Sequence, residues 1–266
     1  MSSEKIQLYV ISHSPDDIVK IKEDDIYTPL FVGRNGQDNL GFTSDDSGDN
    51  ISSKNPNYCE LTGLYWMWKN SDADIIGLCH YRRYFKNNGH NIKKEEIIDY
   101  LTDYDIILPK KTELIKGSLA ETYKDTYFLE VLMDSRNIIN RLYPEYVDSF
   151  DKVMNGSSFS SYNMFIMKKE LVDNYCNWIF PILSEIEKDI DLSIEPRIFG
   201  LISEAILNVW VDGNNLKVKE LNLKYIGSSL KRRMFISDSK LLRKTYRFIY
   251  KKNPKLAKKI MEFFYG

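Results

Sequence analysis

Short runs of apolar, β-branched residues alternate with longer stretches of helical periodicity, and this alternation limits the chain to an α/β architecture. Such a sheet carries its ligand chemistry at the carboxyl ends of its strands. The predicted strands lie at residues 6–11, 74–79, 105–108, 159–167 and 216–225, the last as an edge or late strand. The predicted helices lie at residues 58–70, 94–102, 119–142, 144–154, 169–186 and 198–212.

Composition excludes several classes of protein. The chain contains 13 Phe, 4 Trp and 18 Tyr, which is far too aromatic for a disordered chain. It has no apolar stretch of eighteen residues, as a membrane-spanning helix requires, and its first residues do not resemble a secretory leader. Three cysteines are too few for a disulfide framework or a four-ligand zinc site. We therefore expect a reduced, cytoplasmic protein.

The net charge of −1 conceals a strong asymmetry. Residues 231–266 carry twelve Lys or Arg against two acidic residues, so residues 1–230 carry the compensating negative charge. The basic segment contains two amphipathic helical patterns, which favour peripheral attachment to an anionic membrane surface. Packing on the body or a dimer contact remains the alternative. The acidic body disfavours nucleic acid as a partner, and the sequence leaves the oligomeric state open.

The most informative local motif is His80-Tyr81-Arg82-Arg83-Tyr84-Phe85, which directly follows the predicted strand at 74–79. A histidine and two arginines at a strand end can place fixed hydrogen-bond donors beside a phosphate group. A solvated basic turn is the competing interpretation of the same residues.

The acidic residues indicate less about function than this motif does. Asp45, Asp46 and Asp49 lie in a long irregular stretch at 33–57, where they could be turn residues or metal ligands. Glu204 interrupts an apolar helical pattern, so it is either a general base or the partner of an arginine such as Arg197. The sequence contains no Gly-x-x-x-x-Gly-Lys, Gly-x-Gly-x-x-Gly or Gly-x-Ser-x-Gly pattern, which disfavours NTPases, Rossmann dehydrogenases and hydrolases.

Longer ordered motifs carry a resemblance over roughly residues 5–227. They include YVISHS, DDSGDNISSKNPNYCELTGLYWMWKN, DIIGLCHYRRYF, YNMFIMKKELVDNYCNWIFPIL and EPRIFGLISEAILNVWV. Together they resemble a bacterial family of capsular and exopolysaccharide biosynthesis proteins, catalogued as a domain of unknown function and treated as glycosyltransferases. Ala205 follows Glu204 here, where relatives commonly have arginine.

The resemblance implies a GT-A-like mixed sheet flanked by helices. The charge asymmetry divides the chain into a catalytic domain over residues 1–230 and a basic helical tail over 231–266. The positions that match its motifs include Asp49, Asn50, Asn55, Tyr58, Glu60, Thr62, His80, Tyr81, Arg82, Arg83, Asn163, Arg197 and Glu204.

The roles implied for these residues follow the chemistry of a sugar transfer. Cationic side chains would neutralise the leaving diphosphate, so we expect no required metal, although Mg²⁺ or Mn²⁺ is the alternative. The donor-binding set is Ser12, His13, His80, Tyr81, Arg82 and Arg83. The candidate general bases of an inverting transfer are Glu204 and then Asp49, and the sugar- or acceptor-binding set is Asn50, Asn55, Glu60, Asn163 and Arg197.

The expected function is therefore transfer of a sugar from a nucleotide sugar, with UDP-galactofuranose favoured, to a lipid-linked glycan at the inner face of the plasma membrane. A non-catalytic nucleotide-sugar or glycan binding module of a polysaccharide assembly complex is the alternative.

Overall fold

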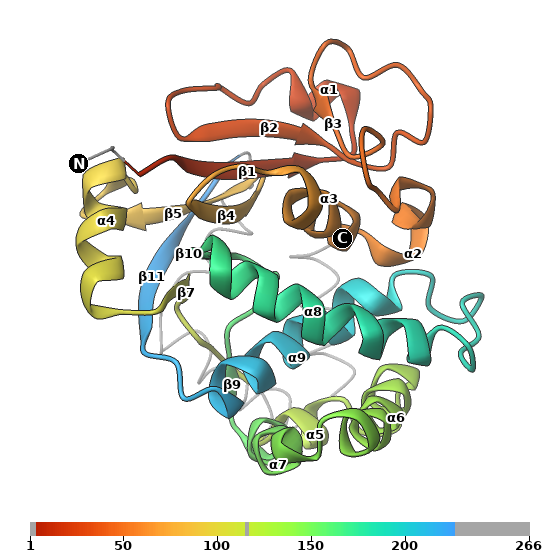
Figure 1. Cartoon of the computed structure of the whole chain (residues 1–266). Coiled ribbons are helices and arrows are strands. Elements are labelled where there is room, and N and C mark those ends of the chain that lie inside the picture. The colour runs from red at the N-terminus through yellow and green to blue at the C-terminus, as the bar shows by residue number, and fades with distance from the viewer. Residues whose placement is uncertain (1–3, 115–116, 227–266) are drawn as a thin grey trace, which may run out of the picture.

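The computed structural model describes residues 4–114 and 117–226. Within these ranges the chain is a mixed α/β protein whose strands form one large sheet and one small ribbon (Figure 1). In spatial order the large sheet contains β3 (Thr43–Ser44), β2 (Tyr27–Phe31), β1 (Ile6–Ser12), β4 (Ile75–His80), β10 (Phe165–Lys168), β7 (Ile106–Pro109), β11 (Val218–Tyr225), β5 (Arg83–Asn87) and β6 (His90–Asn91). The ribbon pairs β8 (Thr112–Glu113) with β9 (Ser158–Phe159).

The large sheet is partly closed on itself. β4 and β5 form a tight hairpin in which His80 pairs with Arg83. The same two strands are also linked through β10, β7 and β11, which follow one another in the sheet from β4 to β5. β10 runs antiparallel to β4 and β7, and β11 runs parallel to β7 and antiparallel to β5. As a result, the carboxyl ends of β1, β4 and β11 meet the beginnings of β5 and β10 at one edge.

Helices surround this sheet. They are α1 (Pro15–Ile18), α2 (Asn55–Tyr58), α3 (Leu61–Asn70), α4 (Lys94–Asp103), α5 (Leu119–Thr122), α6 (Tyr127–Leu142), α7 (Val147–Asn155), α8 (Lys169–Ile186) and α9 (Ile198–Gly213), with short 3₁₀ turns at Ser52–Lys54 and Pro144–Tyr146. α8 packs against β4, β10 and α3, while α9 packs against α2, α7 and α8. In Figure 1, α5, α6 and α7 lie beyond α8 and α9.

The predicted alternation of strands and helices is confirmed, with several differences. The strand predicted at 159–167 is divided, because Tyr162 and Asn163 adopt left-handed conformations with φ of 78° and 52°. The helix predicted at 119–142 is likewise divided, near Asp125, whose φ is 61°. β2 went unpredicted because Pro29 lies inside it. β11 lies between β7 and β5, so it is an interior strand and not an edge.

A further difference concerns the helix predicted at 58–70. It is broken at Cys59, whose φ of 52° and ψ of −128° end α2 before α3 begins at Leu61. Asn57, within α2, donates a hydrogen bond to the Pro196 carbonyl oxygen. The predicted basic tail at 231–266 lies outside the described residues.

The close approach of β1, β4 and β10 requires a small residue at position 77. A Cβ atom at Gly77 would lie 2.4 Å from Leu8 Cδ2, 3.0 Å from Ile166 Cγ1 and 3.2 Å from the Phe165 carbonyl oxygen. Neighbouring strands in the sheet centre cannot move apart without losing packing, so this contact is not easily relieved.

Gly77→Ala should therefore lower the free energy of unfolding by about 1–3 kcal/mol, the usual cost of overpacking a core. Urea denaturation followed by tryptophan fluorescence measures this change. Lys86→Ala, on the exposed part of β5, is the control and should change stability by about 0.5 kcal/mol or less. Equal stability of the Gly77→Ala and wild-type proteins would contradict the tight packing at this position.

Candidate functional site

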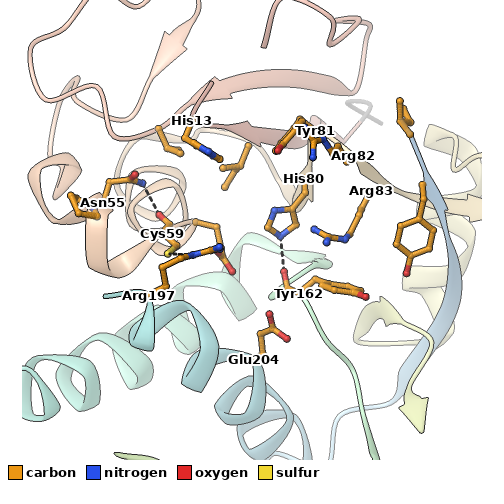
Figure 2. Close-up of a pocket in the computed structure, with 16 residues that line it drawn as sticks. His13, Asn55, Cys59, His80, Tyr81, Arg82, Arg83, Tyr162, Arg197 and Glu204 are labelled. Carbon is orange, nitrogen blue, oxygen red and sulfur yellow. Dashed lines mark hydrogen bonds between the residues drawn. The ribbon is translucent and has the colours of Figure 1, made fainter. Parts of the chain in front are cut away.

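A pocket of about 540 Å³ lies at the edge where the strand ends meet. The strands β1, β4, β5 and β11 and the helices α2 and α9 contribute to its wall (Figure 2). The segments that follow β2 and precede β10 complete it. The residues that line it are Ile11, His13, Val32, Asn55, Pro56, Cys59, Glu60, His80, Tyr81, Arg82, Arg83, Tyr162, Arg197, Glu204, Tyr225 and Ile226.

The two adjacent arginines of the β4–β5 hairpin have different surroundings. Arg82 is half exposed and forms an ion pair with Asp17 at 3.3 Å, and its guanidinium lies over the Tyr81 ring. The Arg83 guanidinium lies 4.2 Å from the centre of the Tyr162 ring, and its Nε is buried without a hydrogen-bond partner. Arg83 is therefore the more rigidly held cation, with hydrogen-bonding capacity to spare for an anion.

The segment before β10 connects several groups of the pocket. The Tyr162 carbonyl oxygen lies 2.8 Å from His80 Nε2, and the Tyr162 backbone also hydrogen-bonds Glu204. Two consecutive non-glycine residues with positive φ are uncommon and occur mainly where surrounding contacts hold them in place. Here the bend turns the Tyr162 backbone toward His80 and Glu204 while its ring supports Arg83.

Asn163 holds this bend from behind the pocket. Its side-chain amide is buried and donates to Glu60 Oε1 at 2.7 Å, to the Gly200 carbonyl oxygen at 3.0 Å and to Ser203 Oγ at 2.8 Å. Glu60 is itself 9% exposed, so this amide supplies the hydrogen bond that a buried carboxylate requires. The contacts join the start of α3 and the first turns of α9 to the entrance of β10.

Glu204 projects into the pocket from α9, a helix that is otherwise almost entirely apolar toward the core. Burial raises the pKa of Glu204 to about 7, and the negative charge of Glu60 adds to the rise. The Tyr162 backbone hydrogen bond and the charges of Arg83 and Arg197 act in the opposite direction. A carboxylate with this pKa can take up a proton at neutral pH and release it again.

The remaining cation of the pocket lies at the amino end of α9. Arg197 Nε donates a hydrogen bond to Cys59 Sγ at 3.4 Å, and Figure 2 shows the two side chains side by side. Burial raises the pKa of the Cys59 thiol, so the thiol is neutral at pH 7. Arg197 thus keeps its full charge for other groups in the pocket.

Burial lowers the pKa of His80, and the nearby charges of Arg83 and Arg197 act in the same direction, whereas Glu60 opposes them. His80 is therefore a neutral imidazole at pH 7. The sequence predicts a cationic side chain at this position, whereas the structure indicates a neutral one. The reason is that the strand end is more enclosed than its polar sequence indicates.

The structure brings most of the predicted site residues together. Those that line the pocket are His13, Asn55, Glu60, His80, Tyr81, Arg82, Arg83, Arg197 and Glu204. Ser12 is buried beside the pocket and bonds to the Ser14 backbone, and Asn163 supports the wall from behind. The roles assigned to these residues stay predictions.

Two predicted residues lie apart from this set. Asp49 accepts a hydrogen bond from the Tyr65 hydroxyl, and Asn50 donates one to the Gly48 carbonyl oxygen. Both residues belong to the long loop, and neither lines the pocket. Asp45 is buried and accepts hydrogen bonds from the Gly33 backbone and the Ser52 hydroxyl. In residues 4–114 and 117–226 no group of three or more His, Cys, Asp or Glu side chains could hold a metal ion.

Sequence reasoning missed Cys59, Tyr162 and Tyr225 as pocket residues. Cys59 and Tyr162 lie inside motifs that carry the resemblance, but the local pattern predicts a helix around Cys59 and a strand around Tyr162, so neither stands out as a pocket residue. No described helix is long and apolar enough to cross a bilayer.

Two comparisons with known proteins find a match for this chain. No curated protein matches the chain. A solved structure described as the apo form of the bifunctional glycosyltransferase WbbM matches with 30% identity and a TM-score of 0.75. The match covers 84% of this chain and 46% of that one, so this chain spans about half the length of WbbM. The family model described as "Domain of unknown function (DUF4422)" matches residues 7–215, and the chain therefore belongs to the DUF4422 family.

Proposed function

We propose that this protein is an inverting glycosyltransferase that uses a nucleotide-sugar donor. One observation carries the proposal: a single pocket contains three arginines together with a carboxylate, Glu204, whose pKa is about 7. The arginines suit a diphosphate, and the carboxylate suits a hydroxyl that must lose its proton. Similarity to WbbM supports the same reaction class, and the mixed sheet with flanking helices is compatible with a GT-A-like arrangement.

The reaction assigns a separate task to each group. The acceptor hydroxyl oxygen attacks the anomeric carbon of the donor sugar, forming the new glycosidic bond. The bond between that carbon and the diphosphate oxygen breaks, and its electron pair leaves with the diphosphate. Glu204 takes the hydroxyl proton, while Arg83, Arg82 and Arg197 stabilise the negative charge that develops on the leaving group.

A non-catalytic sugar-binding module is the second candidate function. It would need the arginines and the sugar-binding groups Asn55 and Glu60, but it would have no use for a carboxylate with a pKa near neutrality. Buried carboxylates with shifted pKa values are typical of catalytic sites, so the environment of Glu204 favours the enzyme.

The acceptor we propose is a lipid-linked glycan of capsule, exopolysaccharide or O-antigen biosynthesis. Ile226 lines the pocket, and the basic segment 231–266 follows it in the chain after four residues. Its attraction to anionic lipid would hold the pocket near the inner membrane surface, where such an acceptor presents its sugar.

A panel of nucleotide sugars tests the proposed reaction class. We expect slow release of free nucleotide from one donor, with UDP-galactofuranose tried first, because glycosyltransferases hydrolyse their donors when the acceptor is absent. Nucleotide release is measured by chromatography, with and without EDTA, and we expect it to survive the chelator. Binding of nucleotide sugars without any release would favour the non-catalytic module.

The arginine pair provides a sharper test, because the two residues are adjacent but differently held. Arg83→Ala should reduce kcat/KM by about 2–4 kcal/mol of transition-state stabilisation, since it removes a preorganised charge from the leaving group. Arg82→Ala is the matched control and should cost clearly less, because Arg82 is more exposed and is paired with Asp17. Equal losses in the two variants would contradict the distinction drawn between them.

The pH dependence tests Glu204. Only the ionised carboxylate can accept a proton, so kcat/KM should rise with pH and level off above a midpoint of about 7. Glu204→Gln has the same shape but cannot accept the proton, so it should be nearly inactive and its residual rate should lack this limb. An active Glu204→Gln variant with an unchanged pH profile would show that another group is the base.

A further inference from the structure

The hydrogen bond between His80 and Tyr162 determines which ring nitrogen of His80 carries a proton. His80 Nε2 lies 2.8 Å from the Tyr162 carbonyl oxygen, and a carbonyl oxygen can only accept (Figure 2). Nε2 must therefore be an N–H donor. Because burial keeps the ring neutral at pH 7, the other nitrogen, Nδ1, has no proton and presents a lone pair.

Nδ1 is available to a ligand. Within the described residues no protein group hydrogen-bonds it, and it is not among the buried polar atoms that lack a partner. His80 is one of the residues that line the pocket, between the Tyr81–Arg83 hairpin and Tyr162. The pocket wall thus contains a nitrogen that accepts hydrogen bonds at a position where the sequence had indicated a cation.

This chemistry selects the kind of group that can bind there. A phosphate oxygen at neutral pH is an acceptor and would face another lone pair, so Nδ1 is unsuited to the diphosphate. A hydroxyl is a donor and matches it well. We propose that His80 Nδ1 accepts a hydrogen bond from a hydroxyl group of the transferred sugar, with Tyr162 as the positioning residue that fixes the tautomer. This inference rests on the proposed function and adds a sugar-binding contact to it.

The Tyr162 carbonyl is well suited to this positioning role because its direction is strongly constrained. Tyr162 and Asn163 both have positive φ, and the Asn163 amide is tied to Glu60, to Gly200 and to Ser203. A carbonyl held in this way cannot rotate to accommodate an inverted ring. The His80 tautomer is therefore set before any substrate binds, which lowers the ordering cost of binding the sugar.

The tautomer can be measured without substrate. The chain has three histidines, so ¹⁵N spectra of the labelled full-length protein contain few imidazole signals, and His13→Gln, His80→Gln and His90→Gln assign them. We expect His80 to show an unprotonated Nδ1 and a protonated Nε2 at pH 7. A protonated Nδ1, whether in the other tautomer or in the imidazolium, would overturn the proposal.

Two substitutions then separate the hydroxyl contact from the contact with Tyr162. His80→Gln can keep a donor near the Nε2 position but loses the acceptor at Nδ1, whereas His80→Asn can keep an acceptor near Nδ1. With the donor that the nucleotide-sugar panel identifies, His80→Gln should lose at least 10-fold in kcat/KM, and His80→Asn should lose less. Binding of UDP alone, measured by calorimetry, should change less than 2-fold in both variants.

His90→Gln is the control, since His90 bonds to Glu96 outside the pocket and should leave the kinetics unchanged. A 10-fold weaker binding of UDP by His80→Gln would assign His80 to the nucleotide and overturn the sugar contact, as would an equal loss in the two variants. Absence of turnover with every nucleotide sugar would instead overturn the proposed function, and the hydroxyl contact with it, whatever the tautomer.

Discussion

The pocket depends on one buried interaction, the contact between the Asn163 amide and the Glu60 carboxylate. Glu60 opens α3, Asn163 precedes β10, and the same amide reaches the first turns of α9. Three segments far apart in the sequence are joined through one side chain that does not itself line the pocket. An unpaired buried carboxylate in this position would cost several kcal/mol, so the Asn163 amide stabilises the assembled arrangement of these segments.

The same assembly explains why the charges of the pocket work together. Arg83 and Arg197 are brought to the pocket from opposite sides, by the β4–β5 hairpin and by the start of α9. Both lower the pKa of Glu204, and burial more than offsets them. As a result, the pocket combines positive charges that suit an anion with a carboxylate whose pKa is about 7. These two properties ordinarily oppose each other, because nearby positive charges lower the pKa of a carboxylate.

Much of this arrangement was predictable from sequence, for identifiable reasons. The run at 74–79 is apolar and β-branched, so a buried strand that delivers His80 to Arg83 at its end follows from local pattern alone. Glu204 was detectable because a charge inside an apolar helical pattern is conspicuous. The neutral state of His80 was not predictable, because it depends on burial by segments that are distant in sequence.

Other features were hidden because they contradict local propensity. Pro29 removes a backbone donor and argues against a strand, yet β2 lies between β1 and β3. Cys59 and Tyr162 occur in helical and strand-like patterns, respectively, and tertiary contacts force both into left-handed conformations. Patterns report what a segment prefers in isolation, and at these positions the surrounding packing overrides that preference.

The conformation of Cys59 has a consequence for how stability and specificity are balanced in this protein. Its φ of 52° and ψ of −128° belong to a region that glycine occupies easily and a side-chain-bearing residue occupies only at a cost of about 1–3 kcal/mol. Glycine would make the corner between α2 and α3 more stable, but it would remove the sulfur that Arg197 contacts. A more stable variant with glycine at position 59 would therefore lose a side chain that lines the pocket.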